Sequence, residues 1–226
     1  MSEELFEAAD DYDAMLDEGI RLSGEDKSWF IAGRLRWLAE DLPDGFAPGR
    51  ILDFACGTGD TTVALAAAYP EAEVVGADRS EGAIAHARSV HAGAGVRFHV
   101  GGDLPEGPFD LCYVNGAFHH IPAEAQPDVL MRIRAALAPS GWLALFENNP
   151  WNPGARLVMR RIPFDRDAVM LSIPTARRRV RSAGFAEVRP ATSRFWFPRS
   201  LSALRPAERV LSRLPGGAQY LVLARA

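Results

Sequence analysis

The segment that decides the fold is Ile51-Leu52-Asp53-Phe54-Ala55-Cys56-Gly57-Thr58-Gly59-Asp60. Its apolar start predicts a buried strand over 51–55, and the two glycines predict a tight turn whose backbone a ligand can approach closely. A helix is expected from Thr61 onward. Asp78 ends the next apolar run, 19 residues after Gly59. A nucleotide-binding βαβ unit carries its ribose-binding carboxylate at this spacing, so the segment predicts a site for an adenosine-containing cofactor.

Strand and helix patterns alternate around this segment. Strands are expected over 51–55, 73–77, 96–100, 109–115 and 142–147, with helices over 61–68, 81–90, 123–138 and 175–183. Strands separated by helices imply βαβ units and a parallel sheet covered on both faces. Two more β-rich segments, 186–197 and 218–226, bring the expected strands to seven. The pattern therefore predicts a doubly wound α/β fold.

Bulk properties bound the class of protein. The chain has 226 residues and a net charge of −4, which suits a single globular domain over 1–226. No apolar run approaches the ~20 residues of a membrane span, and the acidic N-terminus lacks the apolar core of a secretory signal. Cys56 and Cys112 fit neither a metal-ligand spacing nor a disulfide framework. We therefore expect reduced thiols, no metal site and a cytoplasmic location.

Charge is distributed unevenly along the chain. Residues 151–226 contain 15 arginines and four acidic residues, a net charge of +11, against −15 for residues 1–150. Either the halves neutralise each other in the folded domain, or the basic part faces an anionic partner. Arginine binds carboxylate and phosphate through two hydrogen bonds, and the densest cluster comprises Arg156, Arg160, Arg161, Arg166, Arg177, Arg178, Arg179 and Arg181.

The glycine pattern separates two cofactor classes. A dinucleotide-binding dehydrogenase carries a third glycine for close helix–strand packing beside the pyrophosphate. Here Gly59 is followed by Asp60-Thr61-Thr62, so that signal is missing. A nicotinamide-dependent oxidoreductase stays an alternative, and it lacks an evident proton donor. A non-catalytic cofactor-binding protein is a further alternative.

The chain resembles the class I S-adenosylmethionine-dependent methyltransferases in five segments that occur in the family's order. They are Leu-Asp-Phe-Ala-Cys-Gly-Thr-Gly at 52–59, Val-Val-Gly-Ala-Asp-Arg-Ser at 74–80, Gly-Asp-Leu-Pro at 102–105, Phe-Asp-Leu-Cys-Tyr-Val-Asn-Gly-Ala-Phe-His-His-Ile at 109–121 and Leu-Ala-Pro-Ser-Gly-Trp-Leu at 137–143. The resemblance implies a Rossmann-like sheet, mostly parallel with an antiparallel C-terminal strand. It divides the domain into an N-terminal helical lid (1–45), a cofactor-binding core (50–147) and an acceptor-side part (148–226).

The resemblance also implies roles for individual residues. S-adenosylmethionine would be the cofactor and S-adenosylhomocysteine the product. Asp53 would lie near the methionine amino group, and Ala55, Gly57 and Gly59 beside the cofactor backbone. Asp78 would accept hydrogen bonds from both ribose hydroxyls. Around the adenine and the transferable methyl group the implied residues are Arg79, Asp103, Leu104, Asn115 and Gly116, and from the lid Tyr12, with Asp13 beside it.

His119 and His120 follow the fourth strand, near the expected chemistry. Ligands of open α/β sheets bind beyond the carboxyl ends of the strands, and histidine titrates near neutrality. Both are therefore candidate catalytic bases, and the sequence does not distinguish them. The alternative is a structural role, because one histidine of this turn is often structural in methyltransferases that the chain resembles.

Glu147, Asn149 and Trp151 lie after the fifth strand and are expected to contact the methyl acceptor. Amino-methyltransferases of nucleic acids carry an Asn-Pro-aromatic motif after the fourth strand instead, so we expect no nucleic-acid partner. A rigid proline-braced loop is the alternative for this stretch.

The acceptor is expected to be a small molecule, anionic or partly apolar, methylated at oxygen. A lipid-linked acceptor at the membrane surface is an alternative, because apolar residues and arginines interleave over 195–214. Pro206 and Pro215 limit any helix there to about two turns, so no stable membrane insertion is expected. The sequence does not indicate an oligomeric state.

Overall fold

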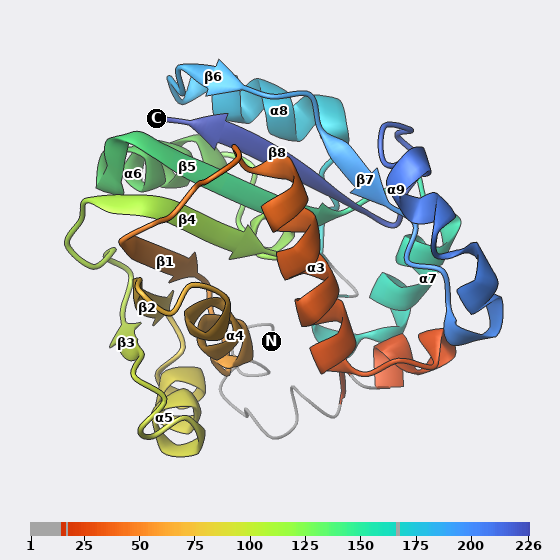
Figure 1. The fold of residues 1–226 in the computed structure, drawn as a ribbon, viewed down its shortest axis with the longest axis horizontal. Coiled ribbons are helices and arrows are strands. Elements are labelled where there is room, and N and C mark those ends of the chain that lie inside the picture. Colours follow the sequence, from red (N-terminus) through yellow and green to blue (C-terminus); the bar gives the residue numbers. More distant parts are fainter. Residues whose placement is uncertain (1–14, 17, 166–167) are drawn as a thin grey trace.

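A computed structural model describes residues 15–16, 18–165 and 168–226. Its centre is an eight-stranded sheet in the order β3-β2-β1-β4-β5-β8-β6, with β7 also paired to β8 (Figure 1). The first five strands pair in parallel, and β8 runs antiparallel to β5, β6 and β7. The strands are β1 Arg50–Phe54, β2 Glu73–Asp78, β3 Arg97–Val100, β4 Phe109–Asn115, β5 Leu137–Asn148, β6 Glu187–Val188, β7 Thr192–Arg194 and β8 Gln219–Arg225.

Helices cover both faces of this sheet (Figure 1). Helices α3 and α4 pack on one face, and α6 and α8 on the other. The α-helices are α3 Lys27–Asp41, α4 Asp60–Ala68, α5 Glu81–Val90, α6 Gln126–Ala136, α7 Pro153–Arg161, α8 Ile173–Ser182 and α9 Ala207–Leu211. The 3-10 helices are η1 Arg21–Ser23, η2 Phe118–His120, η3 Pro163–Asp165 and η4 Arg199–Leu204. In the described part of the chain, no helix combines the length and apolar character that crossing a membrane requires.

The two cores follow from the alternation of side chains along each strand. In β5, Trp142 and Phe146 pack with α3 and α4, whereas Leu143 and Leu145 pack with α6 and α8. Every side chain from Trp142 to Glu147 is at most 4% exposed. A strand buried on both faces belongs in the interior of a parallel sheet.

The expected α/β fold is confirmed, with local differences. Strand β5 begins at Leu137, within the segment expected as a helix over 123–138. The single β-rich segment expected over 186–197 forms two short strands, β6 and β7, because Pro190 and Ala191 interrupt the pairing with β8. Helix α7 was not expected. Asn152 caps it, accepting a hydrogen bond from Ala155 N at 2.9 Å, and Pro153 occupies the first turn, where a missing N–H is tolerated.

Helix α3 ties the N-terminal region to the C-terminal strands. Asp26 caps it by accepting a hydrogen bond from Trp29 N at 2.8 Å. At its other end, Glu40 forms an ion pair with Arg194 of β7, and the Asp41 carbonyl accepts a hydrogen bond from Arg189 at 2.8 Å. Part of the basic C-terminal region therefore neutralises the acidic N-terminal region within the fold.

Candidate functional site

A cavity of about 1330 Å³ opens at the carboxyl ends of β1, β2 and β4. Parallel strands bring those ends to one edge, where α/β proteins bind ligands. The loop after β1, the end of β2, the loop after β3 and the end of β4 each contribute to the wall. Helices α3 and α7 close it from outside the sheet.

The loop after β1 has a strongly constrained backbone. Ala55, Gly57 and Gly59 all have positive φ, at 58°, 53° and 87°. Ala55 and Gly57 line the cavity. A side chain on Gly59 would lie 2.7 Å from the Phe98 ring, so only glycine fits there without displacement. The loop thus presents its backbone to the cavity and packs its far side tightly.

Asp78 lies at the cavity wall and holds the glycine loop. Its carboxylate accepts hydrogen bonds from Gly57 N and Ser80 N, both at 2.9 Å. Each carboxylate oxygen has a second lone pair available for a further donor. The geometry suits a carboxylate that binds paired hydroxyls from the cavity side.

Asp53 lies behind the wall rather than on it. It is 2% exposed and accepts a hydrogen bond from Thr62 Oγ1 at 2.7 Å. Burial raises the pKa of Asp53 to about 7, and the negative charge of Asp78 adds to this shift. The hydrogen bond from Thr62 and the positive charge of Arg34 oppose it. Asp53 therefore acts on the cavity through its charge and through the start of α4, which carries Thr62.

Arg34 is a site residue that sequence reasoning missed. It lies on α3, is only 8% exposed and lines the cavity. Its Nε is buried and has no hydrogen-bond partner among the described residues. A buried guanidinium N–H without a partner is costly, and an anionic ligand group in the cavity would satisfy it. An isolated arginine on a helix of ordinary pattern gave no signal in the sequence.

The opposite end of the wall carries the residues expected around an adenine ring and a reactive methyl group. Arg79, Asp103, Leu104, Asn115 and Gly116 all line the cavity. Asp103 is fully exposed and pairs with Arg132 at 3.3 Å. Asn115 Oδ1 is buried without a hydrogen-bond partner among the described residues. This end therefore offers an unused acceptor at the carboxyl end of β4.

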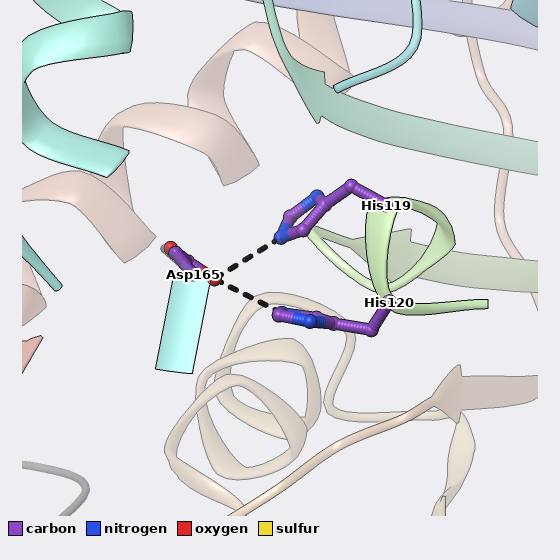
Figure 2. Close-up of side chains that lie close together, drawn as sticks. All are labelled: His119, His120 and Asp165. Carbon is purple, nitrogen blue, oxygen red and sulfur yellow. Dashed lines mark hydrogen bonds and ion pairs between the residues drawn. The ribbon is translucent and has the colours of Figure 1, made fainter. Parts of the chain in front are cut away.

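A cluster of two histidines and a carboxylate occupies the cavity beside this point (Figure 2). Both histidine side chains point toward Asp165, which comes from η3 (Figure 2). His119 Nε2 lies 3.3 Å and His120 Nε2 3.0 Å from the same oxygen, Asp165 Oδ1. On its other side, His119 Nδ1 lies 2.6 Å from Glu147 Oε2.

These carboxylates change the acid–base properties of His119. Burial alone would lower its pKa, but the charge of Glu147 and the contacts with Asp165 raise the pKa to about 10. The same contacts hold the pKa of Asp165 below its usual range despite burial. A histidine that is protonated at neutral pH does not accept a proton, so His120 is the better candidate base.

Comparisons with known proteins agree with this architecture. Residues 51–141 match the family model described as a methyltransferase domain. Over this segment the chain is similar to the class I S-adenosylmethionine-dependent methyltransferases. Trans-aconitate 2-methyltransferase from Methylobacterium nodulans is 36% identical over 143 residues, which are 62% of this chain and 54% of that one. Demethylmenaquinone methyltransferase from Thermus thermophilus is 37% identical over 140 residues, covering 58% and 63%.

Solved structures share the fold of this chain at lower sequence identity. An S-adenosylmethionine-dependent methyltransferase from Archaeoglobus fulgidus superposes with a TM-score of 0.67 at 17% identity, covering 96% of this chain and all of that one. PigF with S-adenosylhomocysteine has a TM-score of 0.68 at 22% identity, covering 99% and 61%. The chain spans less than two thirds of the length of these curated relatives, between about half and 63%.

The acceptor-site residues expected at the end of β5 and just after it do not line the cavity. Glu147 is fully buried and accepts hydrogen bonds from Phe118 N and His119 Nδ1. Asn149 is fully buried and donates to the carbonyls of Pro215 and Gly217 at 2.7 and 2.8 Å. Trp151 is 52% exposed, and its backbone N donates to Asn149 Oδ1 at 3.1 Å. Glu147 thus positions His119, and the other two brace a loop.

The expected arginine cluster is also outside the cavity. Arg156, Arg160 and Arg161 are exposed on α7, and none of the described arginines between 156 and 181 lines the wall. The cavity instead receives Lys27, Arg34, Arg79 and Arg132. Tyr12, Asp13 and Arg166 lie outside the described residues, as do residues 1–14 of the expected N-terminal lid.

Asp165 is a second residue that sequence reasoning missed. It lies 46 positions after His119 in a stretch without periodicity. Only the path of the chain through α7 and η3 brings it to the histidines. An acidic residue within an arginine-rich segment offered no local signal.

Proposed function

We propose that this protein binds S-adenosylmethionine in the cavity and transfers its methyl group to an oxygen atom of a small-molecule acceptor. The observation that carries the proposal is the wall itself. One cavity receives the positive-φ glycine loop, the Asp78 carboxylate at the end of β2 and the open acceptor Asn115 Oδ1 at the end of β4. These are the groups that ribose hydroxyls and a methionine portion require.

The cofactor would be held along its whole length. Asp78 accepts hydrogen bonds from the ribose hydroxyls with the lone pairs that Gly57 and Ser80 leave unused. Leu104 and Asp103 flank the adenine. Arg34 meets the methionine carboxylate, which satisfies its unpaired Nε. The buried charge of Asp53 favours the positive amino group at the same end.

The acceptor would occupy the part of the cavity between α7 and the histidine cluster. Its wall is mostly apolar, with Leu157 and Val158 from α7, Ile162 just after it and Phe195 from the segment after β7. This lining supports an acceptor with an apolar body. Two relatives are named for small-molecule acceptors, trans-aconitate in one case and demethylmenaquinone in the other, and the carboxylates of the first support an oxygen acceptor. The exposed arginines of α7 do not line this part, so an anionic acceptor would depend on the basic residues that do line the cavity, Lys27, Arg34, Arg79 and Arg132.

Methyl transfer needs the acceptor oxygen in line with the sulfonium–methyl bond. The oxygen forms a bond to the methyl carbon while the sulfur keeps the electrons of the breaking bond and leaves as a neutral thioether. Positioning supplies much of the rate. If the acceptor enters as a hydroxyl, its proton needs a base. His120, whose Nε2 already faces Asp165 at 3.0 Å, is the residue we assign to that role.

Calorimetric titration with S-adenosylmethionine and S-adenosylhomocysteine tests the cofactor assignment, with NAD as comparator. We expect both sulfur ligands to bind and the Asp78→Ala variant to lose at least about tenfold in affinity, since charge-assisted hydrogen bonds contribute about 1.5–3 kcal/mol. Heat with NAD alone would overturn the proposal. A screen of acceptors grouped by charge and by hydroxyl or carboxylate nucleophile, with labelled methyl donor, then tests oxygen transfer.

A further inference from the structure

Three side chains of the acceptor end converge as metal ligands do. The ligand atoms of His119, His120 and Asp165 all lie within 4.8 Å of one another. Two imidazole Nε2 atoms face one carboxylate oxygen from different directions (Figure 2). His119 and Asp165 are 5% and 6% exposed, yet all three residues line the cavity. The cluster is therefore enclosed by protein and open on its cavity side.

The separations suit a bound ion. With metal–ligand bonds of about 2.1 Å, neighbouring ligand atoms lie about 3.0 Å apart at a right angle and about 3.4 Å apart at a tetrahedral angle. The His120–Asp165 and His119–Asp165 separations, 3.0 and 3.3 Å, fall in this range. The His119–Asp165 contact is longer than the ~2.7–2.9 Å of a charge-assisted hydrogen bond. The contact between His119 Nδ1 and Glu147 Oε2, at 2.6 Å, is short enough for such a hydrogen bond.

Glu147 completes the pattern on the far side of His119. Metal-binding histidines usually donate their other ring N–H to a carboxylate, which fixes the tautomer and the ring orientation. The 2.6 Å contact between His119 Nδ1 and Glu147 Oε2 does this and leaves Nε2 directed at the cavity. Glu147 is itself held by Phe118 N at 2.7 Å. The ring orientation of His119 is therefore set without Asp165.

Charge balance favours a cation at the same point. Glu147 and Asp165 bring two negative charges into a region that is at most 6% exposed. A protonated His119 compensates only one of these charges, and the uncompensated charge is costly away from water. A divalent ion at the point where the three ligand atoms converge balances both carboxylates.

We propose that His119, His120 and Asp165 bind one divalent transition-metal ion at the acceptor end of the cavity. Two imidazoles and a carboxylate suit zinc or ferrous iron and leave coordination positions open. This replaces the sequence-based expectation of no metal site. If the proposed methyl transfer holds, an acceptor oxygen can occupy an open position, which selects acceptors with a hydroxyl or carbonyl group that can coordinate. With the ion bound, His120 is a ligand and not the base assigned above, and the ion itself lowers the pKa of a coordinated hydroxyl.

Metal binding by the intact protein tests this without any methyl transfer. Protein stripped with a chelator is titrated with Zn²⁺ by calorimetry and with Co²⁺ by visible absorption, which reports coordination geometry. We expect one ion per chain. His120→Asn and Asp165→Asn should weaken binding by more than about 100-fold, and Glu147→Gln by about 10–100-fold, the usual effect of an outer carboxylate partner.

His99→Asn is the matched control, because His99 lies on β3 and does not line the cavity. It should bind metal as the parent does. Circular dichroism establishes that each variant is folded, and titration with S-adenosylhomocysteine reports the cofactor site separately. Folded parent protein that binds neither ion, or binding that survives in both His120→Asn and Asp165→Asn, would overturn the metal site. A folded parent protein that does not bind S-adenosylhomocysteine would instead count against the proposed function.

Discussion

Replacing the two glycines of the loop after β1 by alanine should separate folding from cofactor binding. Both residues have positive φ, 53° at Gly57 and 87° at Gly59. An L-residue in this region costs about 1–2 kcal/mol. Gly57→Ala adds only that strain, because nothing lies within 4 Å of its new Cβ. The neighbouring Ala55 already has φ 58°, so this loop accommodates alanine in such a conformation.

Gly59→Ala carries an additional steric cost. Its Cβ would lie 2.7 Å from two atoms of the Phe98 ring and 3.1 Å from Ala87 Cβ. The ring cannot retreat freely, because it also packs over Gly76. Overpacking of this kind costs about 1–3 kcal/mol, so the total is about 2–5 kcal/mol. For a chain of this size that lowers Tm by about 2–4 °C per kcal/mol.

Urea unfolding and S-adenosylhomocysteine titration of both variants provide the assay. Gly59→Ala should lose the larger share of stability. Gly57→Ala should lose only about 1–2 kcal/mol of stability and bind the ligand at least about tenfold more weakly, about 1.4 kcal/mol, because its new methyl group enters the cavity. Equal stability losses in the two variants, or a Gly59→Ala protein as stable as the parent, would refute the loop geometry.

Three further substitutions test other parts of the site. Because burial raises the folded-state pKa of Asp53 from 3.8 to about 7, the folded protein binds more protons than the unfolded chain between these values, and stability should fall as pH rises through that window. Asp53→Asn should remove this slope, which is worth about 3 kcal/mol between pH 5 and pH 8. Unfolding curves at these two pH values measure it, and an unchanged slope would contradict the assignment. Arg34→Met should weaken S-adenosylhomocysteine binding by about tenfold or more while leaving adenosine binding unchanged; calorimetry with both ligands checks this, and equal losses would exclude a contact with the methionine carboxylate. Asn149→Ala should lower unfolding free energy by about 2–4 kcal/mol, because the Pro215 and Gly217 carbonyls lose their donor, yet S-adenosylhomocysteine affinity should stay within about twofold of the parent; a stable variant with impaired binding would restore its role at the site.

The sequence was sufficient to predict those structural features that depend on residues close together in the chain. The strand-glycine-helix segment around Gly57 and the spacing to Asp78 predicted the position of the cofactor wall, because the backbone of a tight turn and the end of a strand depend on neighbouring residues. The alternation of strands and helices predicted the α/β class for the same reason. The match of residues 51–141 to the methyltransferase domain lies within this locally encoded region.

Tertiary structure decided which polar residues face the cavity. Glu147 and Asn149 have a suggestive motif, yet both are fully buried in contacts with distant segments. Arg34 and Asp165 have no motif, but α3 and η3 bring them to the wall. The arginines of α7 are close in sequence to the acceptor end but are exposed and do not line the cavity. The sequence alone thus determined the fold class and the sheet edge at which the cofactor is expected to bind, because short-range patterns encode strands, turns and helices. The acceptor end depended on long-range packing, because its members lie up to 46 residues apart in the case of His119 and Asp165 and meet only in the folded chain.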